Sequence, residues 1–379
     1  MSVLTALAFL PLAIWLYLFL GRGMFWRAQE RDDSQRVPEP AHWPSVTAIV
    51  PARNEADVIT RSLGSLLAQE YPGTFRIVLV DDQSEDGTAK ISRKLHASGR
   101  LMVISGTARP PGWTGKLWAM SQGIAHAAEE PCDYFWFTDA DIAHSPDNLR
   151  CLISRAEERN LSLTSLMAKL SCTTPPERFL IPAFVYFFEM IYPFAWVNDP
   201  ESTVAAAAGG CMLVRRTALQ SAGGLAAIRD ALIDDCALAK LMKVQDPVWL
   251  GITERARSIR LYTNVKAIRR MITRSAYAQL SYSSLLLAGT IAGLIAMFVA
   301  PVLLALFGTG VLRVAGISAW LVMATSFIPM LQFYGRSPTW ALALPLIGIS
   351  YAVFTLDSAV QHWLGRGGMW KGRAQAIAQ

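Results

Sequence analysis

Tyr134-Phe-Trp-Phe-Thr-Asp-Ala-Asp-Ile142 is the stretch around which the rest of the chain is organised. Its apolar, aromatic run predicts a short buried strand that ends in two aspartates. Residues two apart on an extended chain point to the same face, so Asp139 and Asp141 would repel each other unless a cation lies between them. The motif therefore predicts a site for Mg²⁺ or Mn²⁺ completed by substrate phosphates. The alternative is a pair of solvated loop carboxylates.

The composition favours a protein with membrane segments. Of 379 residues, 53% are hydrophobic and only 17% are charged, and the apolar residues gather at 3–20 and after residue 284. Many arginines and lysines flank these stretches, so the formal charge of +6 points to anionic lipid and not to nucleic acid as a partner. The five cysteines form no C-x-x-C pair, which is typical of reduced thiols facing the cytosol and argues against a zinc site.

The N-terminal apolar stretch predicts a transmembrane anchor over residues 1–21. Val3–Leu20 carries no charge and is close to the minimum length for a spanning helix. A signal peptide is the alternative, but no basic residue precedes the apolar core and no small-x-small cleavage site follows it. The arginines that follow, beginning with Arg22, place the next domain in the cytosol. Residues 22–45, with three prolines, are predicted to be a linker.

Apolar strands alternate with helices over the next hundred residues. The predicted strands are 46–50, 76–80, 101–105 and 134–138. This alternation predicts an α/β domain with a doubly wound, mostly parallel sheet and helices on both faces. Ligands bind such sheets at the carboxyl ends of the strands, and Arg53, Asp82 and Asp139 each follow a predicted strand. We therefore expect these three side chains to lie at one site.

Three further stretches carry candidate residues, each with a structural alternative. Asn54 is predicted to cap the helix after the first strand. Lys116 lies in a glycine-bracketed loop and would contact a diphosphate as a point charge, while the neighbouring Trp113 and Trp118 would stack on a base or simply pack. Asp234 and Asp235 begin a predicted helix, where one of them would serve as a general base or both would only cap the helix.

The second half of the chain predicts membrane contact. Residues 177–197 are dense in aromatics and broken by Pro182 and Pro193, which indicates an interfacial helix or, alternatively, an ordinary buried helix. Three apolar stretches follow, at about 284–307, 314–333 and 339–363, and each is long enough to span. Asp357 and His362 lie in or near the last stretch, which is therefore expected to be partly buried against protein. Four spans would put the basic tail outside, against the positive-inside tendency, so one of the three C-terminal stretches is a candidate re-entrant or interfacial segment.

Four motifs taken together resemble the inverting family 2 glycosyltransferases, which have a GT-A fold. They are Val-Pro-Ala-Arg-Asn-Glu (50–55), Val-Asp-Asp-Gln-Ser-x-Asp-Gly-Thr (80–88), Thr-Asp-Ala-Asp (138–141) and Ile-Asp-Asp-x-x-Leu (233–238). Their order and spacing match over residues 44–275. A finer pattern, at 112–119 and 271–280, resembles the hopanoid-associated glycosyltransferases of bacteria. The implied organisation is a GT-A domain over 46–278 and a membrane region over 279–379.

The resemblance implies a role for each matching residue. Asp235 would be the base that deprotonates the acceptor hydroxyl, and Asp139 and Asp141 would hold a divalent metal, Mg²⁺ or Mn²⁺, with the diphosphate. The residues expected to bind the nucleotide-sugar are Pro51, Ala52, Arg53, Glu55, Asp82, Lys116, Asp139 and Asp234.

One departure from the family pattern bears on the product. Processive members carry Q-x-x-R-W after the base, whereas the nearest stretch here is 271–275, without Gln or Trp. Arg270 and Arg274 remain candidate phosphate contacts. We therefore expect a multi-pass enzyme of the bacterial inner membrane with its catalytic domain facing the cytosol. It would move one sugar from a nucleotide-sugar to a lipid, and the resemblance to the hopanoid-associated enzymes implies a hopanoid as that lipid. The alternatives are a processive polysaccharide synthase, a nucleotidyltransferase and a membrane scaffold that binds nucleotide-sugar without turnover.

Overall fold

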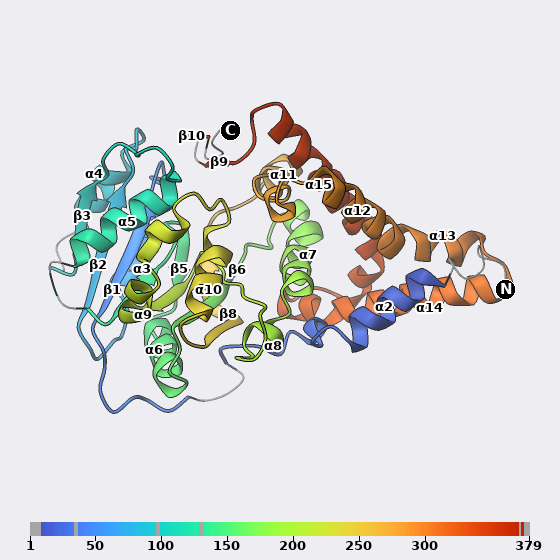
Figure 1. Cartoon of the computed structure of the whole chain (residues 1–379), viewed down its shortest axis with the longest axis horizontal. Helices are drawn as coiled ribbons and strands as arrows, with labels where there is room; N and C mark the ends of the chain where they lie inside the picture. Colours follow the sequence, from blue (N-terminus) through green and yellow to red (C-terminus); the bar gives the residue numbers. More distant parts are fainter. Residues whose placement is uncertain are drawn as a thin grey trace. The chain divides into compact units, whose positions relative to one another are not determined.

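A computed structural model describes residues 9–33, 37–95, 99–128, 130, 132–370 and 373–374. The chain forms two compact units (Figure 1). The sheet unit comprises Glu30–Ser171 and Trp196–Arg260 together with the residues from Met369 onward. The helical unit comprises the residues up to Gln29, Cys172–Ala195 and Leu261–Gly368. The aromatic segment and the residues after 260 therefore cluster with the apolar helices and not with the sheet, unlike the predicted domain 46–278.

The sheet unit is built on one eight-stranded sheet in the order β3-β2-β1-β4-β7-β6-β8-β5. The first four strands in this order are parallel, as are β6 and β8, whereas β7 runs antiparallel to β4 and β6, and β5 to β8. The predicted α/β fold is thus confirmed, with a mixed sheet. The strands are β1 Val46–Ala52, β2 Phe75–Asp81, β3 Leu101–Ser105, β4 Tyr134–Phe137, β5 Ile142–His144, β6 Leu163–Lys169, β7 Met212–Arg215 and β8 Val248–Ser258.

Helices cover both faces of this sheet. In β2, Ile77 and Leu79 belong to the large core cluster that includes Leu63 of α3 and Leu149 of α6. The alternate residues of β2, Val78 and Val80, pack with Ala119 of α5. Successive strand residues point to opposite faces, so α3 and α6 lie on one face and α5 on the other. The helices of this unit are α3 Ile59–Leu67, α4 Thr88–Arg93, α5 Gly115–Ala127, α6 Asn148–Glu158, α9 Arg216–Ser221, η3 Gly224–Ile228 and α10 Asp234–Lys243.

The prediction that Asn54 caps the first helix of the sheet unit is wrong. Helix α3 begins at Ile59 with Val58 as its N-cap, four residues later than Asn54. Asn54 has a φ of 51°, and its side-chain oxygen accepts a hydrogen bond from the Glu85 backbone N–H at 2.9 Å. A short polar side chain tolerates this left-handed conformation, so Asn54 shapes the loop before the helix.

Part of the predicted linker 22–45 packs along the sheet. Arg31 forms a parallel bridge with Ile252 of β8, and the Asp32 backbone N–H donates to the Ile252 carbonyl at 3.3 Å. The Asp32 carboxylate accepts from the Thr253 hydroxyl at 2.6 Å and pairs with Arg255 at 3.0 Å. This acidic residue is therefore a buried structural partner of β8.

The helical unit contains three helical stretches that are long and apolar enough to cross a membrane: Ser284–Phe307, Gly310–Phe333 and Pro338–Trp363. They confirm the predicted C-terminal apolar stretches. The first contains a π-helical turn, η5, immediately before Ala300-Pro301, where proline lacks the N–H that an α-helix would use. The elements are α2 Leu10–Leu20, η1 Phe25–Arg27, α7 Pro175–Ile191, α11 Val265–Thr273, η4 Ala278–Leu280, α12 Ser284–Leu294, η5 Ile295–Val299, α13 Ala300–Phe307, α14 Gly310–Phe333, η6 Pro338–Ala343 and α15 Leu344–Trp363. The short helix α8 Phe194–Val197 crosses the unit boundary, and β9 Met369–Trp370 pairs with β10 Arg373–Ala374.

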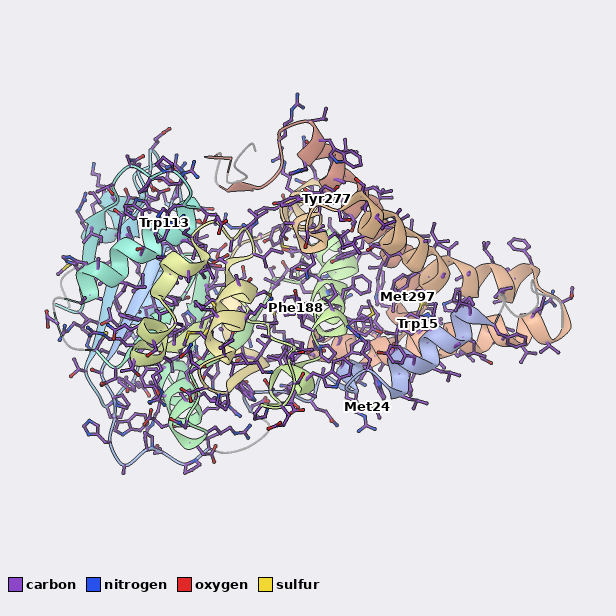
Figure 2. All side chains as sticks on the ribbon, in the orientation of Figure 1. Trp15, Met24, Trp113, Phe188, Tyr277 and Met297 are labelled. Carbon is purple, nitrogen blue, oxygen red and sulfur yellow. The ribbon has the colours of Figure 1, made fainter. Side chains whose placement is uncertain are left out.

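The N-terminal helix packs inside the helical unit. The described helix, α2, has 11 residues, and residues 1–8 of the predicted anchor lie outside the described ones. The Trp15 indole N–H donates to the Met297 carbonyl at 2.7 Å (Figure 2). Pro301, four residues after Met297, has no N–H to donate to the Met297 carbonyl as an α-helix would require. The anchor over residues 1–21 stays a prediction.

Helix α7 runs unbroken through Pro182, one of the two prolines expected to interrupt the aromatic segment. Thr174 and Glu177 form a capping box at its start. Within the helical unit, Tyr186 of α7 hydrogen-bonds Ser326 of α14 at 2.6 Å, and the Leu180 carbonyl accepts from the Tyr351 hydroxyl at 2.9 Å. These contacts favour the buried-helix alternative over the interfacial one.

The expected burial of Asp357 against protein is matched by an ion pair in the helical unit. Arg269 of α11 lies 3.0 Å from the Asp357 carboxylate in α15. A carboxylate in an apolar helix is disfavoured unless it is paired, and Arg269 supplies the opposite charge. The pair fixes α11 against α15.

The close approach of α5 to the sheet gives a stability prediction. A Cβ at Gly123 would lie 2.6 Å from Ile49 Cγ2, whereas a Cβ at Gly64 of α3 would meet nothing within 4 Å. Both Gly→Ala changes gain similar helix propensity, so their difference isolates the steric clash. We expect Gly123→Ala to be less stable than Gly64→Ala by about 1–3 kcal/mol, measured by urea unfolding of the solubilised protein. Equal stability of the two variants would contradict this packing.

Candidate functional site

The two aspartates after β4 are held by two different cations. The Lys116 ammonium lies 2.9 Å from Asp139 Oδ1, and Arg260 Nε lies 2.7 Å from Asp141 Oδ2. Each carboxylate thereby has its own counter-charge, which offsets the repulsion expected from their spacing. Burial raises the pKa of Asp139, in spite of Lys116.

Lys116 joins the carboxylate of Asp139 to the start of α10. It lies in the first turn of α5, and its ammonium is also 3.0 Å from Asp234 Oδ2. Burial acts to lower the pKa of Lys116, but the charges of Asp139, Asp234 and Asp235 outweigh burial and raise it. Lys116 is therefore a fixed positive charge between Asp139 and Asp234, which are 95 positions apart in the sequence. The predicted loop cation, diphosphate aspartate and helix-start aspartate are brought together.

Asp235 is oriented by backbone donors. Its Oδ2 accepts from the Gly209 N–H at 2.9 Å, and its Oδ1 accepts from the Cys236 N–H at 2.8 Å. A Cβ at Gly209 would lie 3.0 Å from the Lys116 ammonium, so this position needs glycine for the close approach. Burial and the neighbouring charge of Asp234 raise the pKa of Asp235 to about 6. A carboxylate with such a pKa is suited to accept a proton near neutral pH.

The predicted nucleotide residues lie at the ends of β1 and β2. Pro51 and Ala52 close β1 and pair in register with Val80 and Asp81 of β2. The buried Arg53 donates through Nη1 to the backbone carbonyls of Asp82 and, at 3.2 Å, Gln83. Arg53 therefore holds the loop after β2, and it lies 3.8 Å from the Asp82 carboxylate.

The loop after β1 is fastened to the loop after β2. The Glu55 backbone N–H donates to the Thr88 hydroxyl at 2.8 Å, and the Asn54 N–H donates to the Ser84 hydroxyl at 2.9 Å. The structure thus brings Pro51, Ala52, Arg53, Glu55 and Asp82 to one edge of the sheet, as the motifs predicted. Parallel neighbouring strands expose such loops on the same side, where ligands bind.

Arg260 is a site residue that sequence reasoning missed. It follows β8 and pairs with Glu55 as well as with Asp141. Burial acts to lower the pKa of Arg260, but the charges of Asp141 and Glu55 raise it above its usual range. Arg260 lies two residues after the end of a strand, and this position would have marked it as a candidate. The strand 248–258 was not recognised from the sequence, so Arg260 was not identified.

Other polar and aromatic residues near these strands contact one another within the sheet unit. His144 is buried, with its ring nitrogens 2.8 Å from the Thr138 hydroxyl and 2.9 Å from the Asn148 amide. Burial lowers the pKa of His144 to about 3, so the ring is neutral. Trp113 and Trp118 pack edge to face on each other, with centroids 5.3 Å apart (Trp113 is labelled in Figure 2).

The predicted metal site rests on Asp139 and Asp141, and the predicted additional phosphate contacts rest on Arg270 and Arg274. Among the described residues, no cluster of three or more His, Cys, Asp or Glu side chains suits a metal ion. Asp139 and Asp141 supply two hard carboxylates, the ligand type that Mg²⁺ and Mn²⁺ prefer when phosphates and water complete the shell. Arg270 lies in α11 and Arg274 is its C-cap. They belong to the helical unit, so their phosphate contacts stay predictions.

Comparison with known proteins bears on this arrangement. Residues 47–223 match the family model described as Glycosyl transferase family 2. The 4,4'-diaponeurosporenoate glycosyltransferase of Staphylococcus aureus (strain bovine RF122 / ET3-1) is 34% identical over 98 residues, which are 26% of this chain and 24% of the relative. The succinoglycan biosynthesis protein ExoO of Rhizobium meliloti (strain 1021) is 34% identical over 114 residues, 30% of each chain. The match thus spans less than a third of either relative's length.

A solved structure shares the fold over nearly the whole chain. It is the mannosyltransferase PcManGT from Pyrobaculum calidifontis in complex with GDP-Man and Mn²⁺, with a TM-score of 0.53, 19% identity, and coverage of 95% of this chain and 99% of that one. At this identity the likeness concerns the fold alone. The family match and the fold together identify residues 47–223 as a family 2 glycosyltransferase domain with a GT-A-like fold.

Proposed function

We propose that this chain transfers a single sugar from a nucleotide-sugar, a UDP-sugar, to a lipid acceptor, with inversion. The observation that carries the proposal is the ion-paired cluster in which Lys116 joins Asp139 to Asp234, next to Asp235. It puts a fixed cation between a phosphate-binding motif and a candidate base. Direct displacement requires both elements close together.

In the proposed reaction Asp235 accepts the proton of the acceptor hydroxyl. The acceptor oxygen then forms a bond to the anomeric carbon while the bond from that carbon to the diphosphate oxygen breaks. The electron pair leaves with the nucleoside diphosphate, and Lys116 and Arg260 stabilise the developing charge. Attack from the face opposite the leaving group inverts the anomeric configuration.

Asp139 and Asp141 would hold a divalent metal, Mg²⁺ or Mn²⁺, at the diphosphate. The ion, when bound, supplies positive charge to the leaving group. The donor set fits, because hard carboxylates next to a phosphate site are typical ligands of both ions. Lys116 and Arg260 pair with the two carboxylates and orient them.

The apolar helices of this chain support a lipid as the acceptor. Three helices are long and apolar enough to span, and the resemblance of residues 112–119 and 271–280 to hopanoid-associated enzymes makes a hopanoid the first acceptor to test. On the positive-inside tendency, we place the chain in the bacterial inner membrane with its catalytic domain in the cytosol.

A polysaccharide synthase is the second candidate function. The relative ExoO is named for succinoglycan biosynthesis, whereas the other relative is named for diaponeurosporenoate. The stretch 271–275 lacks the Gln and Trp of the processive pattern, so we favour a single transfer. The products separate the two: one sugar on each lipid, or a polymer.

The experiment that tests the proposal is nucleoside diphosphate release by purified, detergent-solubilised protein. UDP-sugars and GDP-sugars are screened with Mg²⁺ or Mn²⁺, with and without a hopanoid-containing lipid extract, beside Asp141→Ala. Lipid-dependent release that is lost in the variant, with a singly glycosylated lipid as product, supports the proposal. A folded protein that binds a nucleotide-sugar but releases no diphosphate with any acceptor indicates a binding role instead.

Asp235→Asn is predicted to abolish sugar transfer while leaving donor binding intact. The amide is isosteric but is not a base, so the expected loss in kcat is about 10²–10⁴-fold. Donor affinity is measured by calorimetry beside the rate. Asp230→Asn, an exposed change on the preceding loop, is the matched control and should keep its rate. Full activity of Asp235→Asn rules out this base.

The pH dependence of transfer follows from the pKa of Asp235. The base acts when deprotonated, and its pKa is raised to about 6. We therefore expect kcat/KM to be level above pH 7 and to fall about tenfold per pH unit well below pH 6. The measurement is a rate profile from pH 5 to 8, with protein folding followed by circular dichroism. A profile that stays level to pH 5 is incompatible with this assignment.

Removal of divalent metal is predicted to stop transfer. Treatment with EDTA should remove activity, and added Mn²⁺ or Mg²⁺ should restore it, because the leaving diphosphate then regains its counter-charge. In Asp141→Asn, restoration should require a higher metal concentration by about tenfold or more, since one anionic ligand is lost. Undiminished activity in EDTA would show that Lys116 and Arg260 suffice.

A further inference from the structure

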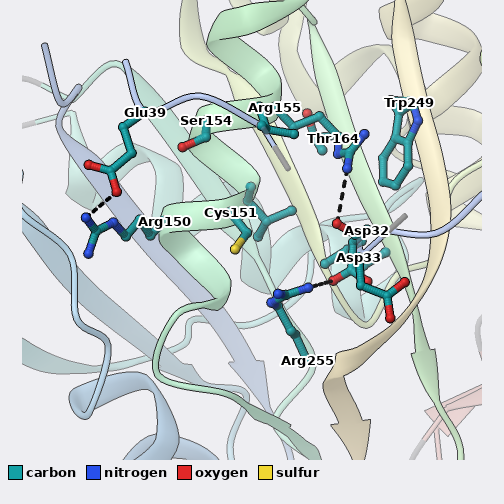
Figure 3. Close-up of a pocket in the computed structure, with 13 residues that line it drawn as sticks. Asp32, Asp33, Glu39, Arg150, Cys151, Ser154, Arg155, Thr164, Trp249 and Arg255 are labelled. Carbon is teal, nitrogen blue, oxygen red and sulfur yellow. Dashed lines mark hydrogen bonds and ion pairs between the residues drawn. The ribbon is translucent and has the colours of Figure 1, made fainter. Parts of the chain in front are cut away.

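The sheet unit contains a cavity of about 310 Å³ that shares no lining residue with the candidate site (Figure 3). It lies among α6, β6, β8 and the segment that packs along β8. Most charged side chains in its lining have a partner of opposite charge. Asp32 pairs with Arg255 at 3.0 Å, Asp33 pairs with Arg31 at 2.7 Å, and Glu39 pairs with Arg150.

Arg155 is the exception among the described residues. Its side chain is almost fully buried, with 4% of the residue exposed, and its one hydrogen bond goes from Nη2 to the Asp32 backbone carbonyl at 3.2 Å. The guanidinium lies over the Trp249 ring, 4.0 Å from the centroid, and Figure 3 shows it between Trp249 and Asp32. No carboxylate of the described chain lies within ion-pair distance of it. A guanidinium has five N–H donors, so most of them are uncommitted.

A second polar group in the same lining also lacks a partner. Thr164 of β6 is fully buried, and its hydroxyl makes no hydrogen bond in the described structure. Buried hydroxyls are normally satisfied, so an unused one beside an unpaired cation is an independent sign of a ligand. Leu152, Leu166 and Trp249 give the rest of the lining an apolar character.

We propose that this cavity binds a small organic oxyanion, a carboxylate or a phosphate ester. Its charged group would pair with Arg155 and accept from Thr164, and its apolar body would pack on Leu166 and Trp249. A buried cation is strongly disfavoured unless an anion pairs with it, and the planar guanidinium matches both oxyanions. The proposal does not depend on the proposed function, because it involves other residues.

The cavity carries its own chemical probe. Cys151 lines it with a free, partly exposed thiol. Alkylation of Cys151 by iodoacetamide, followed by mass spectrometry of the intact full-length protein's peptides, reports occupancy locally. Cys172 and Cys236 are also partly exposed thiols outside any disulfide, lie outside the lining and serve as internal references.

The probes are benzoate, phenyl phosphate and the neutral benzamide, which differ in the group offered to Arg155. At benzoate about ten times its Kd, alkylation of Cys151 should slow about tenfold while that of Cys172 and Cys236 is unchanged. Benzamide at the same concentration should give no protection. Comparison of benzoate with phenyl phosphate shows which oxyanion the cavity prefers. Equal protection by benzamide and benzoate, or none by either anion, overturns the proposal.

Two variants test the residues assigned to the anion. Arg155→Gln should weaken benzoate binding about tenfold or more, because charge-assisted hydrogen bonds are lost. Arg150→Gln, which removes a lining arginine that already has Glu39 as its partner, is the matched control and should bind normally. If Arg155→Gln does not fold, the isosteric Thr164→Val should still weaken binding severalfold. Unchanged binding in a folded Arg155→Gln protein would mean that Arg155 only stacks on Trp249.

Discussion

The site depends on one partly buried cation, Lys116. It lies in the first turn of α5, where the helix dipole disfavours positive charge, so its position has to be stabilised by something else. Its ion pairs with Asp139 and Asp234 supply that stabilisation. In return, the ammonium allows the carboxylates of Asp139, Asp234 and Asp235, from two distant parts of the sequence, to lie near one another, which their mutual repulsion would otherwise oppose.

Arg260 completes a second pair of contacts on the same principle. It connects the end of β8 to Asp141 after β4 and to Glu55 after β1. Lys116 and Arg260 thus each hold two carboxylates, one set at the start of α10 and the other at the β1 loop. These ion pairs fix the charged side chains in position, and on the proposed function such fixed charges need little reorganisation during the reaction. The pKa of Asp235 depends on the same charges: burial and the charge of Asp234 raise it, and the charge of Lys116 lowers it.

The sequence predicts those parts of the site that follow a recognisable strand. The parallel strands and their polar ends were predictable, because each strand is short, apolar and followed by a turn. That placed Arg53, Asp82 and Asp139 correctly at one edge. Strand β8 was missed because Gly251 interrupts it and its second half alternates charged with small residues. Arg260 was not predicted either, because only its position just after the end of β8 marks it as a site residue.

The partition of the chain was the least predictable feature. Residues 172–195 and 261–368 are separated by a segment of the sheet unit, yet both belong to the helical unit. No local sequence pattern shows that these two segments belong together, because contacts between distant residues, such as Tyr186 with Ser326, hold them in one unit. The consequence is mechanical. The chain passes repeatedly between a unit with a buried polar site and a unit whose helices expose large apolar residues such as Leu285 and Val311. Water disfavours that exposure and lipid does not. On the proposed function, the covalent connections tether the catalytic unit to the membrane helices, which raises the effective concentration of a lipid acceptor.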